Sequence, residues 1–184
     1  MNRRKDALLA AAKMSVEIKS IAERSGGGVC TIGSWVTKPG MVTSVVEECW
    51  NILDQCHFDP VALARMLTGA QEESDRFARE GNVSVGWERI WPIAPRPLHP
   101  ELIGLCDAAI REKCGTSHRL ASGPLHDAGE MRGAGGPTVM MFVQSLHGIS
   151  HNKMEDTPEE HREAGVRAFD RLVDKTQAWI VGRN

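Results

Sequence analysis

Four prolines within nine residues near the middle of the chain limit how its two halves can be joined. They are Pro92, Pro95, Pro97 and Pro100. Proline has no backbone N–H and interrupts both helices and strand ladders, so this segment predicts an irregular connector. A chain of 184 residues is long enough for one domain or two small ones. We therefore expect one domain over residues 1–95 and a second over residues 96–184.

The first half begins with the pattern of a helix followed by a hairpin. Apolar residues recur at helical spacing over residues 5–24, which predicts an amphipathic helix. Residues 29–36 and 42–54 are rich in β-branched residues and tryptophan and flank Pro39-Gly40, which predicts two strands joined by a turn.

A second helix and a third strand are expected next. Asp59 is a suitable N-cap, Pro60 fits the first helical position, and Gly81 ends the apolar stripe. Apolar and polar residues then alternate over residues 83–91, as in a half-buried strand. The predicted order is that of a βαββαβ unit without its first strand.

The second half has the pattern of an α/β layer. Ile103, Cys106, Ile110 and Cys114 define one predicted helix face, and residues 139–143 are apolar throughout, as in a central strand of a parallel sheet. Thr157 and Glu160 form a capping-box pattern around Pro158 that predicts the start of a closing helix.

Charge and composition exclude several classes of protein. Lys and Arg total 22 against 24 Asp and Glu, with a net charge of −2, so we expect no nucleic-acid partner and no anionic membrane surface. The apolar run near the N-terminus is too short for an export signal and no run suits a membrane span, which predicts a cytoplasmic protein. Five cysteines without a C-x-x-C pair fit a disulfide framework or a zinc ribbon poorly.

Histidines suggest where chemistry could lie. Ligands gather beyond the carboxyl ends of strands in open α/β sheets, and the segment after residue 143 contains His147 and His151. Imidazole is the commonest metal ligand, so His151 is a candidate ligand, although loop histidines are most often solvated. His147 is a weaker candidate because Gly148 and the missing glutamate argue against a helical H-E-x-x-H site.

His126 and Asp127 form a second candidate. Adjacent side chains do not readily hydrogen-bond as a dyad, so each needs a partner elsewhere, and Asp127 could equally be a helix cap. The sequence contains no G-x-G-x-x-G, P-loop or G-x-S-x-G pattern, so nucleotide binding and serine hydrolysis lack support.

Several segments together resemble a known family. Residues 122–128 (SGPLHDA), 137–143 (PTVMMFV) and 148–152 (GISHN) with Glu155 are similar to the C-terminal signature of the hydantoinase/carbamoylase amidohydrolases. This family includes N-carbamoyl-L-amino-acid hydrolases, allantoate amidohydrolases and β-ureidopropionases. Segments of the first half resemble the family's lid, or dimerisation, domain: residues 4–8, 31–33, 38–40 and 53–54.

The resemblance implies a fold and a site. Residues 1–95 would be an incomplete βαββαβ lid domain, and residues 96–184 the C-terminal part of an α/β metallohydrolase domain. His151 would be the last ligand of a site for two zinc or manganese ions. His126 and Gly123 would line the substrate pocket, with Asp127 supporting His126. The lid would form a homodimer.

The chain also departs from the family pattern. The metal-binding half that supplies the other ligands and the general base is absent from these residues. Thr43 stands where many members have a substrate-binding Asn, and Cys56 where an Arg usually pairs with the substrate carboxylate. Losing that charge-assisted contact removes roughly 1.5–3 kcal/mol of substrate-binding free energy.

The sequence therefore predicts a metal-dependent hydrolase of C–N bonds other than peptide bonds. Its substrates would resemble N-carbamoyl or ureido amino acids, and the chain would be N-terminally truncated and inactive alone. The alternatives are a non-catalytic dimerisation module, an aminoacylase- or carboxypeptidase-like amidohydrolase, and a half-site completed by a separate chain. The particular substrate and metal stay open.

Overall fold

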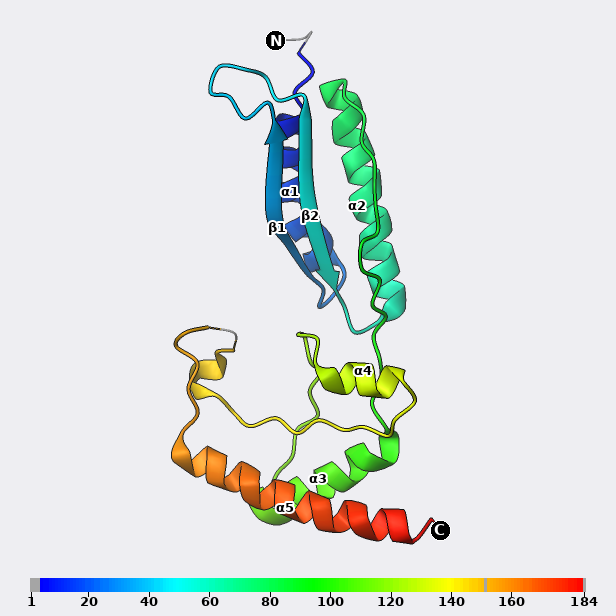
Figure 1. Cartoon of the computed structure of the whole chain (residues 1–184), viewed down its shortest axis with the longest axis vertical. Helices are drawn as coiled ribbons and strands as arrows, with labels where there is room; N and C mark the ends of the chain where they lie inside the picture. Colours follow the sequence, from blue (N-terminus) through cyan, green and yellow to red (C-terminus); the bar gives the residue numbers. More distant parts are fainter. Residues whose placement is uncertain (1–3, 151, 184) are drawn as a thin grey trace. The chain divides into compact units, whose positions relative to one another are not determined.

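A computed structural model describes residues 4–150 and 152–183. The chain divides into two compact units between Pro95 and Arg96 (Figure 1). Each unit mixes helices with extended segments, and the only ladder in the described residues is a two-stranded sheet in the first unit. No helix in these residues has the length and hydropathy needed to span a membrane.

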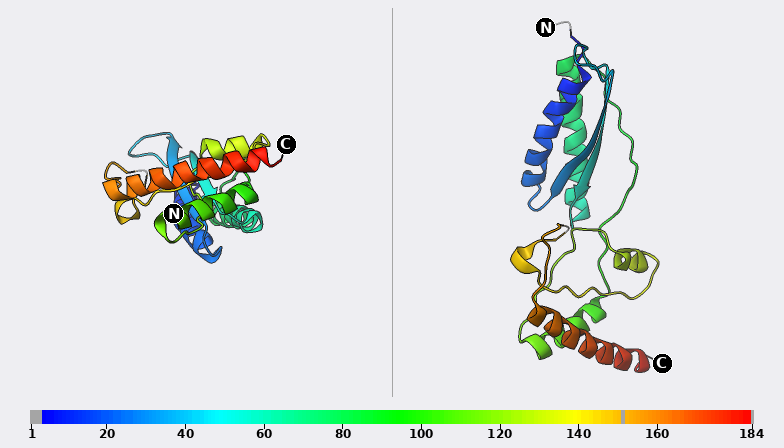
Figure 2. Two further views of the ribbon diagram at one scale, coloured as in Figure 1. Left: turned by 90° about the horizontal axis from the view of Figure 1, so that it is seen from below. Right: turned by 60° about the vertical axis from the view of Figure 1, so that its left-hand side comes forward.

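The first unit consists of two helices packed on one face of a hairpin. Its elements are α1 (Ala7–Arg24), β1 (Val29–Lys38), β2 (Glu48–Cys56) and α2 (Pro60–Gly81). The strands pair antiparallel, with an irregularity between Ile32 and Ser34, and both helices lie on the same side of them (Figure 2). The core joins α1 to α2 beneath the hairpin: Met14, Ile18, Ile21, Ala22, Met66, Ala70 and Phe77, with Ala10, Cys30, Ile32 and Leu53 against them.

Both predicted helices of this unit are confirmed, and their caps explain where they begin. The Asp6 carboxylate accepts a hydrogen bond from the Leu9 N–H (3.1 Å), and that of Asp59 accepts one from the Val61 N–H (2.9 Å). Each bond satisfies an N–H that has no partner within its helix. Asn82 ends α2 in the left-handed region, with φ of 52°, which asparagine tolerates better than most residues.

Two strand predictions for the first unit need correction. The second strand begins at Glu48 rather than at residue 42, so residues 39–47 form a nine-residue connection instead of a tight turn at Pro39-Gly40. Residues 83–91 run extended beside α2 (Figure 1) but pair with no strand in the described chain. Alternating hydrophobicity gives a chain the side-chain pattern of a strand, but a ladder also requires a neighbouring backbone.

The second unit is built on the packing of its two long helices. Its elements are α3 (Pro100–Cys114), α4 (Asp127–Gly133), the 3₁₀ turn η1 (Leu146–Gly148) and α5 (Glu159–Val181). The buried residues are Cys106 and Ala109 of α3 and Leu172 of α5. Val139 and Met141 of the apolar run pack against this cluster.

Three details of the second unit also differ from expectation. Residues 139–143 are extended but unpaired, and Phe142 and Val143 are 46% and 43% exposed, so this run is not a central strand in the described structure. The buried face of α3 contains Leu102, Cys106 and Ala109, whereas Cys114 is exposed. Pro158 occupies the N-cap position of α5, and no side chain caps that helix.

Candidate functional site

The His126 imidazole lies at the start of α4 and is available to a ligand. His126 is the N-cap residue of this helix, but its side chain makes no capping bond. Its carbonyl oxygen accepts from the Gly129 N–H at 2.8 Å, and its ring lies edge-on to Phe142, with centroids 6.5 Å apart. The side chain is half-buried, and no hydrogen bond to either ring nitrogen is found in the described residues.

Gly123 and Asp127 flank this imidazole in the sequence, and both are exposed. Asp127 is the first residue of α4 rather than its cap, so its carboxylate lies at the positive end of a short helix. Ser122 fixes the preceding turn by donating from Oγ to the Pro124 carbonyl at 2.9 Å. Within residues 4–150 and 152–183, Asp127 makes no hydrogen bond to His126.

Two arginines that sequence reasoning missed hold α4 in place. The Arg96 guanidinium donates to the Gly129 carbonyl and contacts the Glu130 carboxylate, both at 2.9 Å. Arg132 donates from Nε to the Pro97 carbonyl at 3.1 Å. These contacts join residues more than 30 positions apart, and no local pattern reveals them.

The loop after the apolar run is closed by backbone contacts. The Leu146 N–H donates to the Asp156 carbonyl at 2.8 Å, and His161 Nδ1 lies 3.3 Å from the Gln144 carbonyl oxygen. His147 adopts a left-handed conformation, with φ of 56°, which is uncommon for a residue with a Cβ. The predicted metal ligand His151 falls in this loop but lies outside the described residues.

The two positions at which the sequence departs from the family pattern belong to the first unit. Thr43 is exposed in the connection between β1 and β2, whereas Cys56 is half-buried at the end of β2. Cys56 Sγ lies 3.6 Å from an oxygen of Asp54. Burial, followed by the negative charge of Asp54, raises the pKa of the Cys56 thiol. This side chain is therefore a neutral group at pH 7, unlike the arginine expected in the family.

The described residues do not form a metal site. No group of three or more His, Cys, Asp or Glu side chains comes close enough to hold an ion in residues 4–150 and 152–183. A catalytic zinc site needs about three protein ligands and an open position. Residues 4–150 and 152–183 by themselves therefore do not supply the ligands of a complete catalytic centre.

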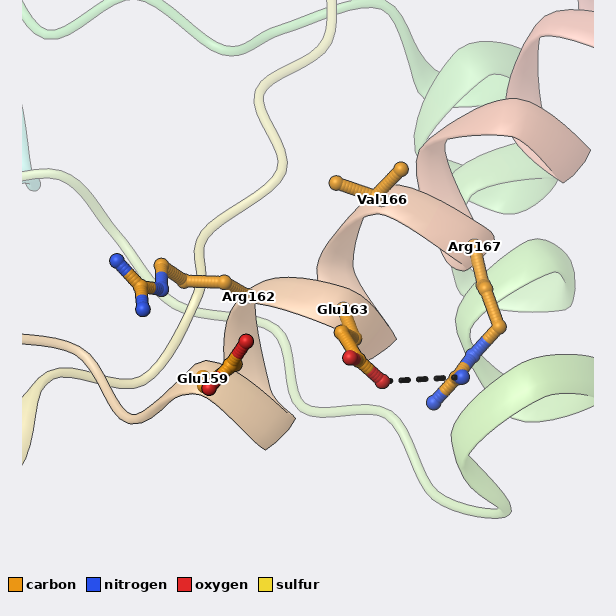
Figure 3. Close-up of a pocket in the computed structure, with 5 residues that line it drawn as sticks. All are labelled: Glu159, Arg162, Glu163, Val166 and Arg167. Carbon is orange, nitrogen blue, oxygen red and sulfur yellow. Dashed lines mark ion pairs between the residues drawn. The ribbon is translucent and has the colours of Figure 1, made fainter.

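A shallow surface of the second unit lies at the start of α5 and carries none of the predicted site residues. It is a shallow face lined by Glu159, Arg162, Glu163, Val166 and Arg167 (Figure 3). Glu163 and Arg167 form an ion pair of 3.5 Å one turn apart, and such exposed pairs contribute little. This surface is a solvated helix face.

Comparison with known proteins shows the family to which this chain belongs. Residues 5–175 match the model of peptidase family M20/M25/M40, and the chain belongs to this family. A crystal structure of a hydantoinase/carbamoylase family amidase from Burkholderia vietnamiensis superposes with a TM-score of 0.82 at 29% identity, covering 92% of this chain and 41% of that one.

Two relatives with named activities are similar to this chain. An N-carbamoyl-L-amino acid amidohydrolase of Geobacillus stearothermophilus is 26% identical over 173 residues, which are 94% of this chain and 42% of the relative. An allantoate amidohydrolase of Escherichia coli strain K12 is 27% identical over 172 residues, 92% of this chain and 41% of the relative. The family resemblance inferred from the sequence is thus confirmed, and the chain spans about two fifths of the length of these relatives.

Proposed function

We propose that this chain forms part of an amidohydrolase that cleaves C–N bonds, other than peptide bonds, in N-carbamoyl or ureido amino-acid-like substrates. The observation that carries the proposal is the family match over residues 5–175, together with relatives named N-carbamoyl-L-amino acid and allantoate amidohydrolases. The first unit would act as the lid and dimerisation domain and the second as the C-terminal part of the catalytic domain. A cytoplasmic location is part of this proposal.

His126 is the proposed substrate-orienting residue. Its ring has no partner in the described structure and is held against Phe142, so it can donate a hydrogen bond to a ureido oxygen without first breaking another. Gly123 would line the substrate pocket with His126, and Asp127 would support His126. Thr43 of the first unit is also a proposed substrate-binding residue. Because Cys56 is neutral, we expect weaker recognition of a substrate carboxylate than in relatives with an arginine there.

The metal requirement is part of the proposal. His151 would be one ligand to zinc or manganese, because neutral imidazole is the commonest metal ligand among protein side chains. Since the described residues supply no second and third ligand, hydrolysis would need groups beyond those described here. The chain's own contribution is therefore binding and orientation of the substrate.

The test is an assay of the purified chain with N-carbamoyl amino acids and allantoate in the presence of zinc or manganese. We expect no hydrolysis above background, because a catalytic metal is not retained by one ligand. Binding of N-carbamoyl amino acids, measured by NMR shift changes of the Gly129 and Glu130 amides of α4, is expected in the chain and is expected to disappear in His126→Ala. Metal-dependent turnover by the chain alone, lost in His151→Ala, would contradict the incomplete-site proposal.

A second candidate function is dimerisation without catalysis. The outer face of the hairpin exposes Val29, Val36, Trp50 and Ile52, each at least 49% accessible. Among residues 4–150 and 152–183, β1 pairs with no strand other than β2. Exposed strand edges favour pairing with another chain. Sedimentation at micromolar concentration is expected to show a dimer that Val36→Lys weakens, whereas a strictly monomeric chain would argue against this function.

A further inference from the structure

The short helix α4 depends on contacts from outside itself for its place in the second unit. It is seven residues long, and an isolated helix of that length is marginal in water. None of its residues is buried within the described chain, so apolar packing contributes little to holding it. Polar contacts with the segment that leads into α3 (Figure 1) therefore decide where α4 lies.

The Arg96 side chain fits into a gap on this helix. Its Nη1 donates to the Gly129 carbonyl oxygen at 2.9 Å and lies 2.9 Å from a carboxylate oxygen of Glu130. A Cβ at Gly133 would lie 2.5 Å from Arg96 Nη1 and 2.7 Å from its Cζ. The guanidinium therefore occupies the space that a side chain at Gly133 would need.

Gly129 connects this arginine to His126. Its carbonyl oxygen accepts from Arg96, and its N–H donates to the His126 carbonyl oxygen at 2.8 Å. The His126 ring lies edge-on to Phe142, with centroids 6.5 Å apart, and its nitrogens have no hydrogen bond in the described residues. The placement of the backbone and this ring contact therefore decide where the imidazole points.

From these contacts we propose that Arg96 is a positioning residue that orients the His126 imidazole toward the substrate. This inference rests on the proposed function, in which His126 donates a hydrogen bond to a ureido oxygen. Arg96 holds Gly129, and Gly129 holds the backbone that carries the imidazole. Because hydrogen bonds weaken steeply as their angle departs from linearity, a displaced ring binds the ureido oxygen less tightly.

The first measurement needs no substrate. The Cε1–H and Cδ2–H resonances of His126 in the full chain, assigned by their loss in His126→Ala, sense the ring current of Phe142. Phe142→Leu removes that ring current and sets the scale of the change. We expect Arg96→Gln to shift these resonances by at least half as much as Phe142→Leu does. The Cα shifts of Glu130 and Met131 in α4 are expected to stay helical.

Two further variants separate the contacts that Arg96 makes. Gly133→Ala keeps the arginine but fills its space, so we expect it to shift the His126 resonances in the same direction as Arg96→Gln. Glu130→Gln removes the ion pair and keeps the hydrogen bond to the Gly129 carbonyl, so it is expected to leave the resonances unchanged.

Substrate affinity is the second measurement. Binding of an N-carbamoyl amino acid, followed by calorimetry, is expected to weaken roughly 3- to 10-fold in Arg96→Gln and in Gly133→Ala, the effect of misaligning one hydrogen bond. Glu130→Gln is expected to bind as the wild type does. Gly104→Ala is the control for adding a methyl group to a helix glycine, since nothing lies within 4 Å of a Cβ there.

The positioning role of Arg96 and the proposed function fail in different ways. His126 resonances that stay in place in Arg96→Gln, or that move equally in Glu130→Gln, would overturn the positioning role. Wild-type affinity in Arg96→Gln would overturn it too, as would loss of the helical Cα shifts, because Arg96 would then be needed for α4 itself. A wild-type chain that binds no N-carbamoyl amino acid contradicts the proposed function, and the resonances still decide whether Arg96 orients His126.

Discussion

Gly28 lies where the turn after α1 comes closest to α2. A Cβ at this position would meet Ser25 Oγ and would lie 2.5 Å from Met66 Sδ. Ser25 Oγ accepts a hydrogen bond from the Gly28 N–H at 3.0 Å, and Met66 is 1% exposed. The close approach therefore depends on the missing side chain rather than on an unusual φ.

We expect Gly28→Ala to lower the free energy of unfolding of the first unit by about 1–3 kcal/mol, because a buried methionine must move to admit one methyl group. Urea denaturation followed by circular dichroism measures this. Gly33→Ala is the matched control, since nothing lies within 4 Å of a Cβ there. Equal stability of the two variants would show that Met66 adjusts without cost.

Some residues of the candidate site can be identified from the sequence, and others cannot. His126 could be singled out because it stands in a family-like segment, and the structure adds that its ring lacks a hydrogen-bonding partner in the described residues. Arg96 could not be singled out, because an arginine between two prolines carries no local signal. Its role in holding α4 depends on the tertiary contact with Gly129 and Glu130.

At the scale of elements, α3 and α5 are joined by a charged cluster as well as by their apolar contacts. Glu112 of α3 accepts from Arg171 Nε at 2.8 Å and from Lys175 Nζ at 3.2 Å on α5. The hydrogen bonds from Arg171 and then Lys175 lower the pKa of the Glu112 carboxyl. Such a group stabilises the folded state above its unfolded pKa and loses that contribution as the pH falls through its lowered pKa.

Glu112→Gln is therefore expected to reduce stability at neutral pH and to have progressively less effect on acidification, as the wild-type carboxyl also becomes neutral. Urea unfolding of wild type and variant between pH 7 and pH 3 measures the difference. Glu160→Gln, an exposed residue near the start of α5, is the control. A difference in stability between wild type and Glu112→Gln that grows toward low pH would contradict the lowered pKa of Glu112.

Helices and strands were not equally predictable. The helices followed from patterns within one segment, such as the Asp59 cap and Pro60, so their positions agree closely with expectation. The runs 83–91 and 139–143 are extended, as predicted, but form no ladder in the described residues, because pairing depends on residues distant in sequence. The capping box predicted at Thr157 does not form, because Pro158 occupies the N-cap position of α5.

At the scale of the whole molecule, the two units are joined by a segment without regular structure. Residues 82–99 contain neither helix nor strand, and Arg89 in this stretch is exposed. Local stability is low where backbone groups face solvent and few apolar contacts form. This region is expected to open before either unit unfolds.

Limited trypsin digestion should therefore cut first after Arg89 and release two resistant fragments, which mass spectrometry identifies. The Arg96–Pro97 bond is a poor alternative because proline follows the arginine. Arg89→Gln is expected to slow the first cut substantially, while Arg65→Gln within α2 leaves it unchanged. A first cut inside α2 or α5 would show that a helix opens more readily than the connector.

The sequence alone determined the long helices α1, α2, α3 and α5 and the family, because periodicity, caps and ordered motifs are local or follow chain order. Tertiary structure decided which extended runs pair, how Arg96 fixes α4, and which candidate residues share a unit. Thr43 belongs to the first unit, and Gly123, His126 and Asp127 belong to the second. These outcomes depend on hydrogen bonds and packing between residues far apart in the chain, where a one-dimensional pattern carries no information.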